Sequence, residues 1–177
     1  DSSLETTVAI LNEASRMAEM ELNPLQSIGD QQPAYLENGV VRTAPGFSEG
    51  YKAIADGGWI GVAANSKYGG MGLPLTIQNC VNEMLNSSCL SLALNPLMTQ
   101  GQIDAIETHA NEDIKRIFLP KLNSGEWSGT MNLTEPQAGS DVGALRTIAK
   151  KEKGLDEYGM VTASTKKRKK VKKPNVY

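Results

Sequence analysis

The chain has 177 residues, of which 40% are apolar and 21% are charged, and its formal net charge is −2. This length is enough for one domain, or for one domain and part of a second. No run approaches the roughly 18 consecutive apolar residues of a membrane helix, and the N-terminus has no basic and then apolar signal peptide. The sequence therefore predicts a cytoplasmic protein without a transmembrane helix.

The charges are unevenly distributed along the chain. Residues 166–173 hold seven of the 18 basic residues, and no acidic residue follows them. The rest of the chain has 11 basic residues against 20 acidic ones, a net charge of −9. Three interpretations of this basic tail stay open: a frameshift, assembly error or premature stop; a disordered extension kept open by like charges; or an arm that binds a polyanion such as nucleic acid or anionic lipid.

Cysteine and histidine are too few for several classes of site. Cys80 and Cys89 match neither a disulfide framework nor a zinc-binding spacing, and we expect them to be buried thiols. His109 is the single histidine, which excludes a metal site with several histidine ligands. We expect it at the end of a helix and predict no metal site.

The N-terminal part has the apolar spacing of a helix from Leu4 to Leu22. Ser2 and Glu5 have the spacing of a capping box at its start. Pro24 is predicted to end this helix, and residues 27–35 are predicted to form a loop.

Further elements follow in chain order. Asn38-Gly39 is the dipeptide of a tight hairpin turn. Residues 47–55 are predicted to form a short helix that ends at two glycines, and residues 75–90 and 92–109 are predicted to form two longer helices. The second of these carries a stripe of apolar and small side chains, which we expect to pack in the core: Leu94, Leu97, Met98, Gly101, Ala105 and Ile106.

In the last third of the chain, the predicted elements change from helices to strands. Asn111 is predicted to cap a helix that runs to about Leu122. Beyond it the apolar period shortens, which predicts strands over residues 127–133, 145–152 and 158–164. Helices followed by strands indicate an α+β protein: an N-terminal all-α domain followed by the first strands of an incomplete antiparallel β domain.

The segment from Met131 to Asp141 is the strongest candidate site. Gly139 allows close approach of a ligand to the backbone and tolerates positive φ, and the hydroxyls of Thr134 and Ser140 can donate or accept hydrogen bonds. Successive N–H groups in such a turn can bind a phosphate. The segment is thus either a cofactor-binding turn or an ordinary tight turn.

The motif "TEPQAGSD" at residues 134–141 resembles the flavin-binding signature of the acyl-CoA dehydrogenase family. The resemblance continues through "GGWIGVAANSKYGGMGLP" (57–74), "TQGQIDAIETHANEDIK" (99–115) and "LPKLNSGEWSGTMNLTEP" (119–136). The stretch "LENGVVRTAPGFSEGYKAIADGGW" (36–59) is similar to the bacterial branch that acts on 3-methylmercaptopropionyl-CoA.

The resemblance implies an FAD-dependent oxidoreductase of fatty acid metabolism or of dimethylsulfoniopropionate (DMSP) degradation, which desaturates an acyl-CoA between its α and β carbons. It also implies an electron acceptor such as an electron-transfer flavoprotein, a homo-oligomer when full length, and an acyl-chain pocket partly walled by the helix at 92–109. Ser140 would also touch the substrate. The cofactor-binding residues it implies are Met131, Asn132, Leu133, Thr134, Gly139 and Ser140.

The resemblance assigns a structural role to Glu135 rather than that of the base, and Asp141 is expected to brace the turn. A second flavin-binding strand and the C-terminal helical bundle with the catalytic glutamate have no match in these residues. We therefore expect a fragment that is inactive alone, with residues 1–125 as the helical domain, 126–165 as the start of the β domain and 166–177 as the tail. Alternatives are a non-catalytic protein that binds flavin or acyl-CoA, and an interaction protein with a basic tail.

Overall fold

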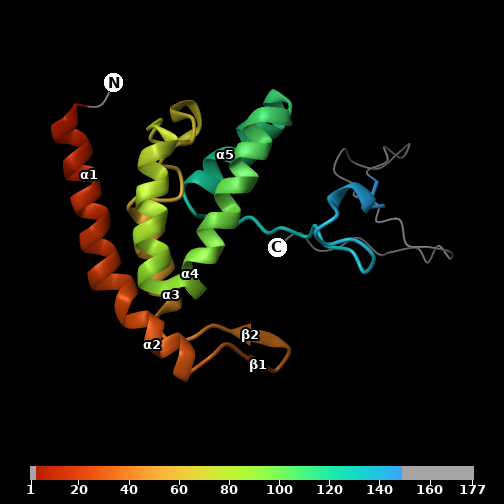
Figure 1. Cartoon of the computed structure of the whole chain (residues 1–177), viewed down its shortest axis with the longest axis horizontal. Coiled ribbons are helices and arrows are strands. Elements are labelled where there is room, and N and C mark those ends of the chain that lie inside the picture. The colour runs from red at the N-terminus through yellow and green to blue at the C-terminus, as the bar shows by residue number, and fades with distance from the viewer. Residues whose placement is uncertain (1–2, 149–177) are drawn as a thin grey trace. The chain divides into compact units, whose positions relative to one another are not determined.

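The computed structural model describes residues 3–148. It has two units, which are treated separately: the first extends to Met131 and the second begins at Asn132. The first unit contains all the longer helices (Figure 1).

The first helix, α1, spans Leu4–Met17. Its N-cap is Ser3, whose hydroxyl accepts a hydrogen bond from the Thr6 N–H at 3.1 Å. The predicted capping box on Ser2 is wrong by one residue. Because Ser3 directly precedes the first helical residue, its side chain is the one that reaches the third N–H of the helix.

Pro24 does not end the helical run, which corrects the prediction. A π-helical turn, η1 (Ala18–Leu22), follows α1 and leads directly into α2 (Asn23–Gln31). Pro24 lies in the first turn of α2, where a helix needs no N–H donor from it. The predicted loop over residues 27–35 therefore begins only after Gln31.

The predicted hairpin is confirmed. Strands β1 (Tyr35–Glu37) and β2 (Val40–Arg42) pair antiparallel, and the turn residues Asn38 and Gly39 both have positive φ, 50° and 78°. This is the backbone that favours Asn-Gly in two-residue hairpins. The short helix is also confirmed as α3 (Phe47–Asp56), with Gly57 as its C-cap.

The two long helices are the two arms of α4 (Leu75–His109). At Cys89 the backbone leaves the helical region (φ −154°, ψ 84°) and the chain reverses, so the arms lie side by side in Figure 1. Asn82 and Gln100 join them through reciprocal amide hydrogen bonds of 2.9 and 3.2 Å. His109 is the last residue of α4, as predicted.

A 3₁₀ turn, η2 (Ser66–Tyr68), precedes α4, and α5 (Glu112–Asn123) follows it. Asn111 caps α5 as predicted, accepting from the Ile114 N–H at 2.9 Å. Cys80 is a half-buried free thiol and Cys89 a fully buried one. The core draws on every long helix and on the loop before α4; its largest fully buried apolar side chains are Leu22, Ile54, Ile60, Val62, Val81, Leu85 and Leu119.

The described part of the second unit contains a 3₁₀ turn, η3 (Val142–Ala144), and one isolated bridge between Glu135 and Ala138. The strand predicted over residues 127–133 does not form, since a strand requires a paired neighbour and none of residues 3–148 pairs with it. Residues 145–148 are not in a strand either. The remainder of that prediction, the strand at 158–164 and the basic tail at 166–177 lie outside the described residues.

Candidate flavin-binding segment

The chain that leads into the candidate segment is anchored to the helical unit. The Trp127 ring contacts Phe118 edge to face at 5.5 Å and lies beneath the Lys121 ammonium at 4.5 Å. The Trp127 N–H donates to the Lys121 carbonyl at 3.0 Å. Residue 127 is therefore held against α5 by apolar, cation–π and backbone contacts together.

Two residues later the chain is tied to α4. The Gly129 N–H donates to the Thr99 hydroxyl at 2.9 Å, and that hydroxyl donates in turn to the Asn95 carbonyl at 3.0 Å. Thr99 is fully buried. Gly129 packs so closely on α4 that a Cβ there would overlap Gln102. Gly129, two residues before the candidate segment, thus has a defined position on the second arm of α4.

The turn itself is closed by hydrogen bonds within the second unit. Glu135 and Ala138 exchange two backbone hydrogen bonds of 2.9 and 3.0 Å. The Asp141 carboxylate accepts from the Gly143 N–H at 3.1 Å, so Asp141 caps the 3₁₀ turn η3 that follows. These bonds leave Thr134 and Gly139 adjacent: a Cβ on Gly139 would meet only the Thr134 methyl group, at 3.7 Å.

Glu135 is the most heavily hydrogen-bonded side chain in residues 132–148. Its carboxylate accepts from the Arg146 N–H at 3.0 Å and from the Thr147 N–H at 2.7 Å. The Thr147 hydroxyl and the Gln137 amide donate to it as well. These hydrogen bonds, that of the Thr147 hydroxyl foremost, lower the pKa of Glu135 to about 2. The geometry agrees with a structural role for Glu135, because its oxygens are already used by internal donors.

The predicted cofactor-binding residues are all exposed: Met131, Asn132, Leu133, Thr134, Gly139 and Ser140. Within residues 3–148, the backbone N–H groups of Leu133, Thr134, Gly139 and Ser140 donate to no acceptor. Exposed hydroxyls and free N–H groups beside a glycine suit the carbonyl and phosphate oxygens of a dinucleotide. Gly139 does not have positive φ, so its contribution is the space that it leaves.

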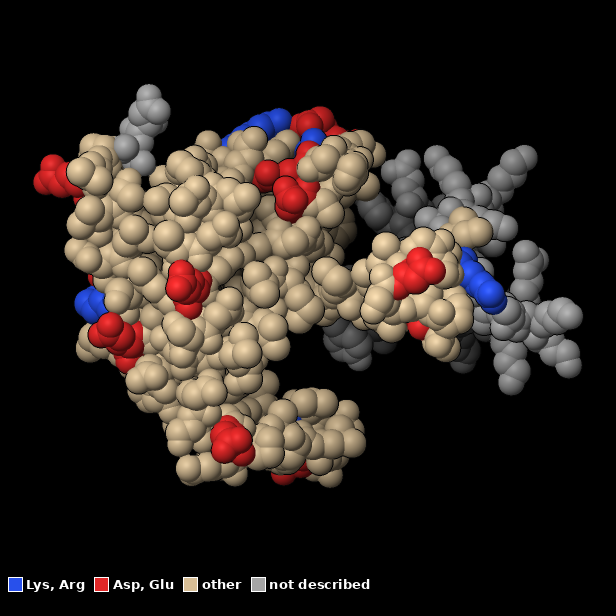
Figure 2. Space-filling view, viewed as in Figure 1, with Lys and Arg blue, Asp and Glu red and all other residues tan. Residues whose placement is uncertain are grey.

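Most of the apolar stripe predicted on the second arm of α4 lies outside the core, and only Ile106, which is half-buried, packs against it as predicted. Leu94, Leu97 and Met98 are 44%, 41% and 37% exposed, and Gly101 and Ala105 are also exposed. The arm turns a different set of residues inward: Leu92, Ala93, Pro96, Thr99, Gln100 and Ile103. Figure 2 shows one face of the molecule as mostly uncharged, with single charged side chains scattered over α1 and α4.

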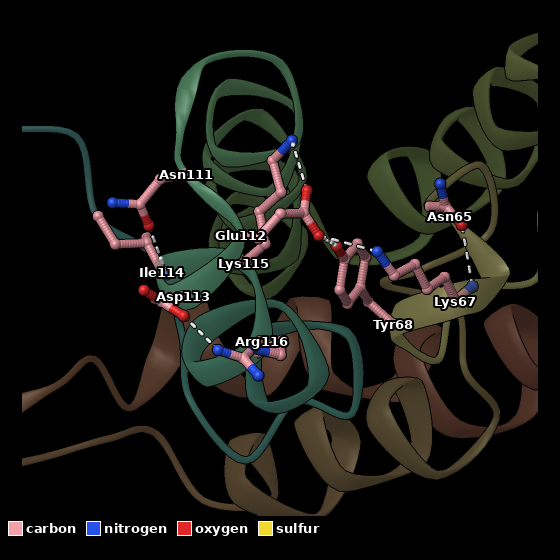
Figure 3. A network of polar contacts seen from close by, with 9 residues as sticks. All are labelled: Asn65, Lys67, Tyr68, Asn111, Glu112, Asp113, Ile114, Lys115 and Arg116. Atoms are coloured by element: carbon pink, nitrogen blue, oxygen red, sulfur yellow. Dashed lines mark hydrogen bonds and ion pairs between the residues drawn. The ribbon is translucent and has the colours of Figure 1, made fainter.

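The glycine-rich loop before α4 is held by side chains from α4 and α5. Lys67 and Tyr68 both donate to the Glu112 carboxylate, at 2.8 and 2.9 Å, and Lys115 lies 3.7 Å from it (Figure 3). The bonds from Lys67 and Tyr68 lower the pKa of Glu112 to about 2. The Asn65 N–H donates to Glu107 at 2.9 Å. The loop is therefore a fixed part of the helical unit.

Two classes of feature are not found in the described part of the chain. Residues 3–148 contain no cluster of three His, Cys, Asp or Glu side chains placed to bind a metal ion. None of the helices there is both long and apolar enough to cross a membrane.

Sequence reasoning did not single out Thr99, Gly129 or Thr147, although each holds the candidate segment in place. Their partners lie 30 and 12 residues away in sequence. No spacing rule connects such pairs. The one available signal was that Gly129 and Thr99 lie inside two of the quoted motifs.

Comparison with known proteins assigns this chain to a family. Residues 5–126 match the model of the acyl-CoA dehydrogenase N-terminal domain. The chain belongs to the acyl-CoA dehydrogenase family, a family of flavoprotein oxidoreductases, as its motifs predicted.

Among individual proteins, the chain is similar to 3-methylmercaptopropionyl-CoA dehydrogenase of Ruegeria pomeroyi, with 42% identity over 146 residues, which is 82% of this chain and 25% of that protein. It is also 37% identical over 101 residues to a butyryl-CoA dehydrogenase of Syntrophomonas wolfei, covering 57% of this chain and 16% of that one. The chain thus spans about a quarter or less of the length of these relatives.

Solved structures support the fold. The butyryl-CoA dehydrogenase of Megasphaera elsdenii superimposes with a TM-score of 0.70 at 24% identity, over 86% of this chain and 38% of that chain. A glutaryl-CoA dehydrogenase gives a TM-score of 0.68 at 24% identity, over 83% of this chain and 35% of that one. The predicted fold class, a helical N-terminal domain followed by the start of a β domain, is confirmed.

Proposed function

We propose that this chain supplies the N-terminal helical domain and the first flavin-binding segment of an FAD-dependent acyl-CoA dehydrogenase. The observation that carries the proposal is the turn at residues 134–141, where exposed hydroxyls and free N–H groups surround Gly139. We place the helical domain at residues 1–125, the start of the β domain at 126–165 and the tail at 166–177.

The proposed flavin-binding residues divide into two groups by their chemistry. The Leu133 N–H and the Thr134 hydroxyl would bind the isoalloxazine ring, with Met131 and Asn132 beside them. Gly139 and Ser140 would bind the pyrophosphate, because two successive free N–H groups and a hydroxyl suit phosphate oxygens. FAD, when bound, would supply the redox chemistry, while these residues orient it.

The exposed apolar face of α4 supports a site for an acyl chain. Leu94, Leu97 and Met98 share one side of the second arm and are 37–44% exposed, and covering apolar surface of this kind is favourable. We propose that an acyl-CoA thioester lies along this face. The family resemblance separately assigns a substrate contact to Ser140. The similarity to the Ruegeria protein favours 3-methylmercaptopropionyl-CoA, and the butyryl-CoA dehydrogenases favour other short to medium acyl chains.

The partners follow from the same family relationship. An electron-transfer flavoprotein is the proposed electron acceptor, because the family resemblance implies one. A homo-oligomer and a cytoplasmic location are proposed for the whole enzyme.

Binding of FAD by the purified 177-residue chain tests the proposal directly. Titration of FAD, followed by the quenching of its fluorescence, should show saturable binding. Ser140→Ala should weaken binding by roughly tenfold, the loss of one hydrogen bond to a charged phosphate. Ser128→Ala is the matched control, because Ser128 is exposed, lies outside the segment and makes no side-chain hydrogen bond within residues 3–148. Absence of FAD binding by the unaltered chain would contradict the proposal.

A further inference from the structure

The Glu135 carboxylate connects both ends of the proposed flavin-binding turn. Glu135 directly follows Thr134, and its side chain accepts from the backbone of Arg146 and Thr147, 11 and 12 residues later. Gln137, inside the turn, donates to the same carboxylate. One side chain therefore closes a loop that contains Gly139, Ser140 and Asp141.

The hydrogen bonds to Glu135 favour its ionised form, so they persist at neutral pH. Glu135 is half-buried, and its oxygens accept from two backbone N–H groups, one hydroxyl and one amide. Hydrogen bonds to an ionised acceptor are about twice as strong as those between neutral groups. Because these donors hold the pKa of Glu135 at about 2, the carboxylate stays ionised at neutral pH and keeps all its bonds.

We propose that Glu135 is a positioning residue, which holds residues 134–147 in the one conformation that presents Thr134, Gly139 and Ser140 together to the flavin. This inference rests on the proposed function. Glu135 would act through the backbone that it closes and not by touching the flavin. Without it, the turn would have to be ordered by the ligand, and the ordering cost would reduce affinity.

Two substitutions test whether the hydrogen bonds to the Glu135 carboxylate, and not merely a side chain at this position, order the turn. Glu135→Ala removes every acceptor. Glu135→Gln keeps one acceptor oxygen, which can still serve Thr147, but places an NH₂ group against the other donors. Glu83→Gln is the matched control, because Glu83 is exposed on α4 and its side chain makes no hydrogen bond within residues 3–148.

The experiment measures two quantities on the full 177-residue chain: the FAD dissociation constant, and hydrogen exchange of the Arg146 and Thr147 amides without FAD. We expect Glu135→Ala to weaken FAD binding by roughly ten- to a hundredfold and to abolish amide protection. Glu135→Gln should give intermediate values for both, and Glu83→Gln should match the unaltered chain.

The outcomes distinguish the two proposals. If the unaltered chain binds FAD and Glu135→Ala binds it equally well, the positioning role is wrong and the proposed function stands. The same holds if the amides of Arg146 and Thr147 exchange at the same rate in all variants. If the unaltered chain binds no FAD, the proposed function fails and the positioning role fails with it.

Discussion

The Thr99 hydroxyl shows how one buried polar group can fix a distant stretch of backbone. It accepts from the Gly129 N–H and donates to the Asn95 carbonyl, so both of its hydrogen-bonding functions are used inside the protein. Unpaired polar groups are costly when buried. The backbone at Gly129, two residues before the proposed flavin-binding segment, is therefore held against α4.

Replacing Thr99 by valine keeps the shape of the side chain but leaves the buried Gly129 N–H without an acceptor. We expect the free energy of unfolding to fall by about 1–3 kcal/mol, measured from urea denaturation. Thr130→Val is the control, since Thr130 is exposed and should change stability by no more than about 0.5 kcal/mol. Equal stability of the two variants would show that the Thr99 hydrogen bond has no net effect.

At the level of elements, the glycine-rich loop and α4 use glycine for different reasons. Gly70 lies against the Ala64 carbonyl, and a Cβ there would overlap that backbone group. Gly101 lies within the second arm of α4, and a Cβ there would meet nothing within 4 Å. The first glycine is required by packing, whereas the second only lowers helix propensity.

We expect replacement by alanine to have opposite effects on stability at these two glycines. Gly70→Ala should destabilise the protein by about 1–3 kcal/mol, because the loop backbone must move. Gly101→Ala should stabilise it by up to about 1 kcal/mol, through helix propensity. Thermal unfolding of both variants beside the unaltered chain provides the measurement. A stabilising effect at Gly70 would mean that the loop is not packed as described.

At the scale of the whole chain, none of these 177 residues matches the catalytic glutamate that the family resemblance implies. We expect the 177-residue chain to form no enoyl-CoA when supplied with FAD, an acyl-CoA and an artificial electron acceptor. Loss of a general base alone lowers rates by roughly a hundred- to ten-thousandfold. The assay measures absorbance of the conjugated thioester, with a complete acyl-CoA dehydrogenase as positive control. Enoyl-CoA formation by this chain would place the base within these residues.

Local signals sufficed for much of this protein. The Asn38-Gly39 hairpin, the Asn111 cap, the helix at 47–55 and the two arms of α4 follow from neighbouring residues and are present in the structure. The family assignment likewise rests on linear motifs. Each of these features depends on residues close together in the chain, which is why the sequence alone was enough to determine them.

Only the tertiary structure decided the path of the chain past Pro24 and the buried face of the second arm of α4. Both features depend on contacts between residues that are distant in the sequence. The π-helical turn carries the chain past Pro24, and the reversal at Cys89 decides which side of the second arm faces the core. The apolar spacing of Leu94, Leu97 and Met98 is the same for a buried and an exposed face. Only the burial of Leu92, Thr99 and Ile103 among the other helices shows that Leu94, Leu97 and Met98 lie on the exposed side.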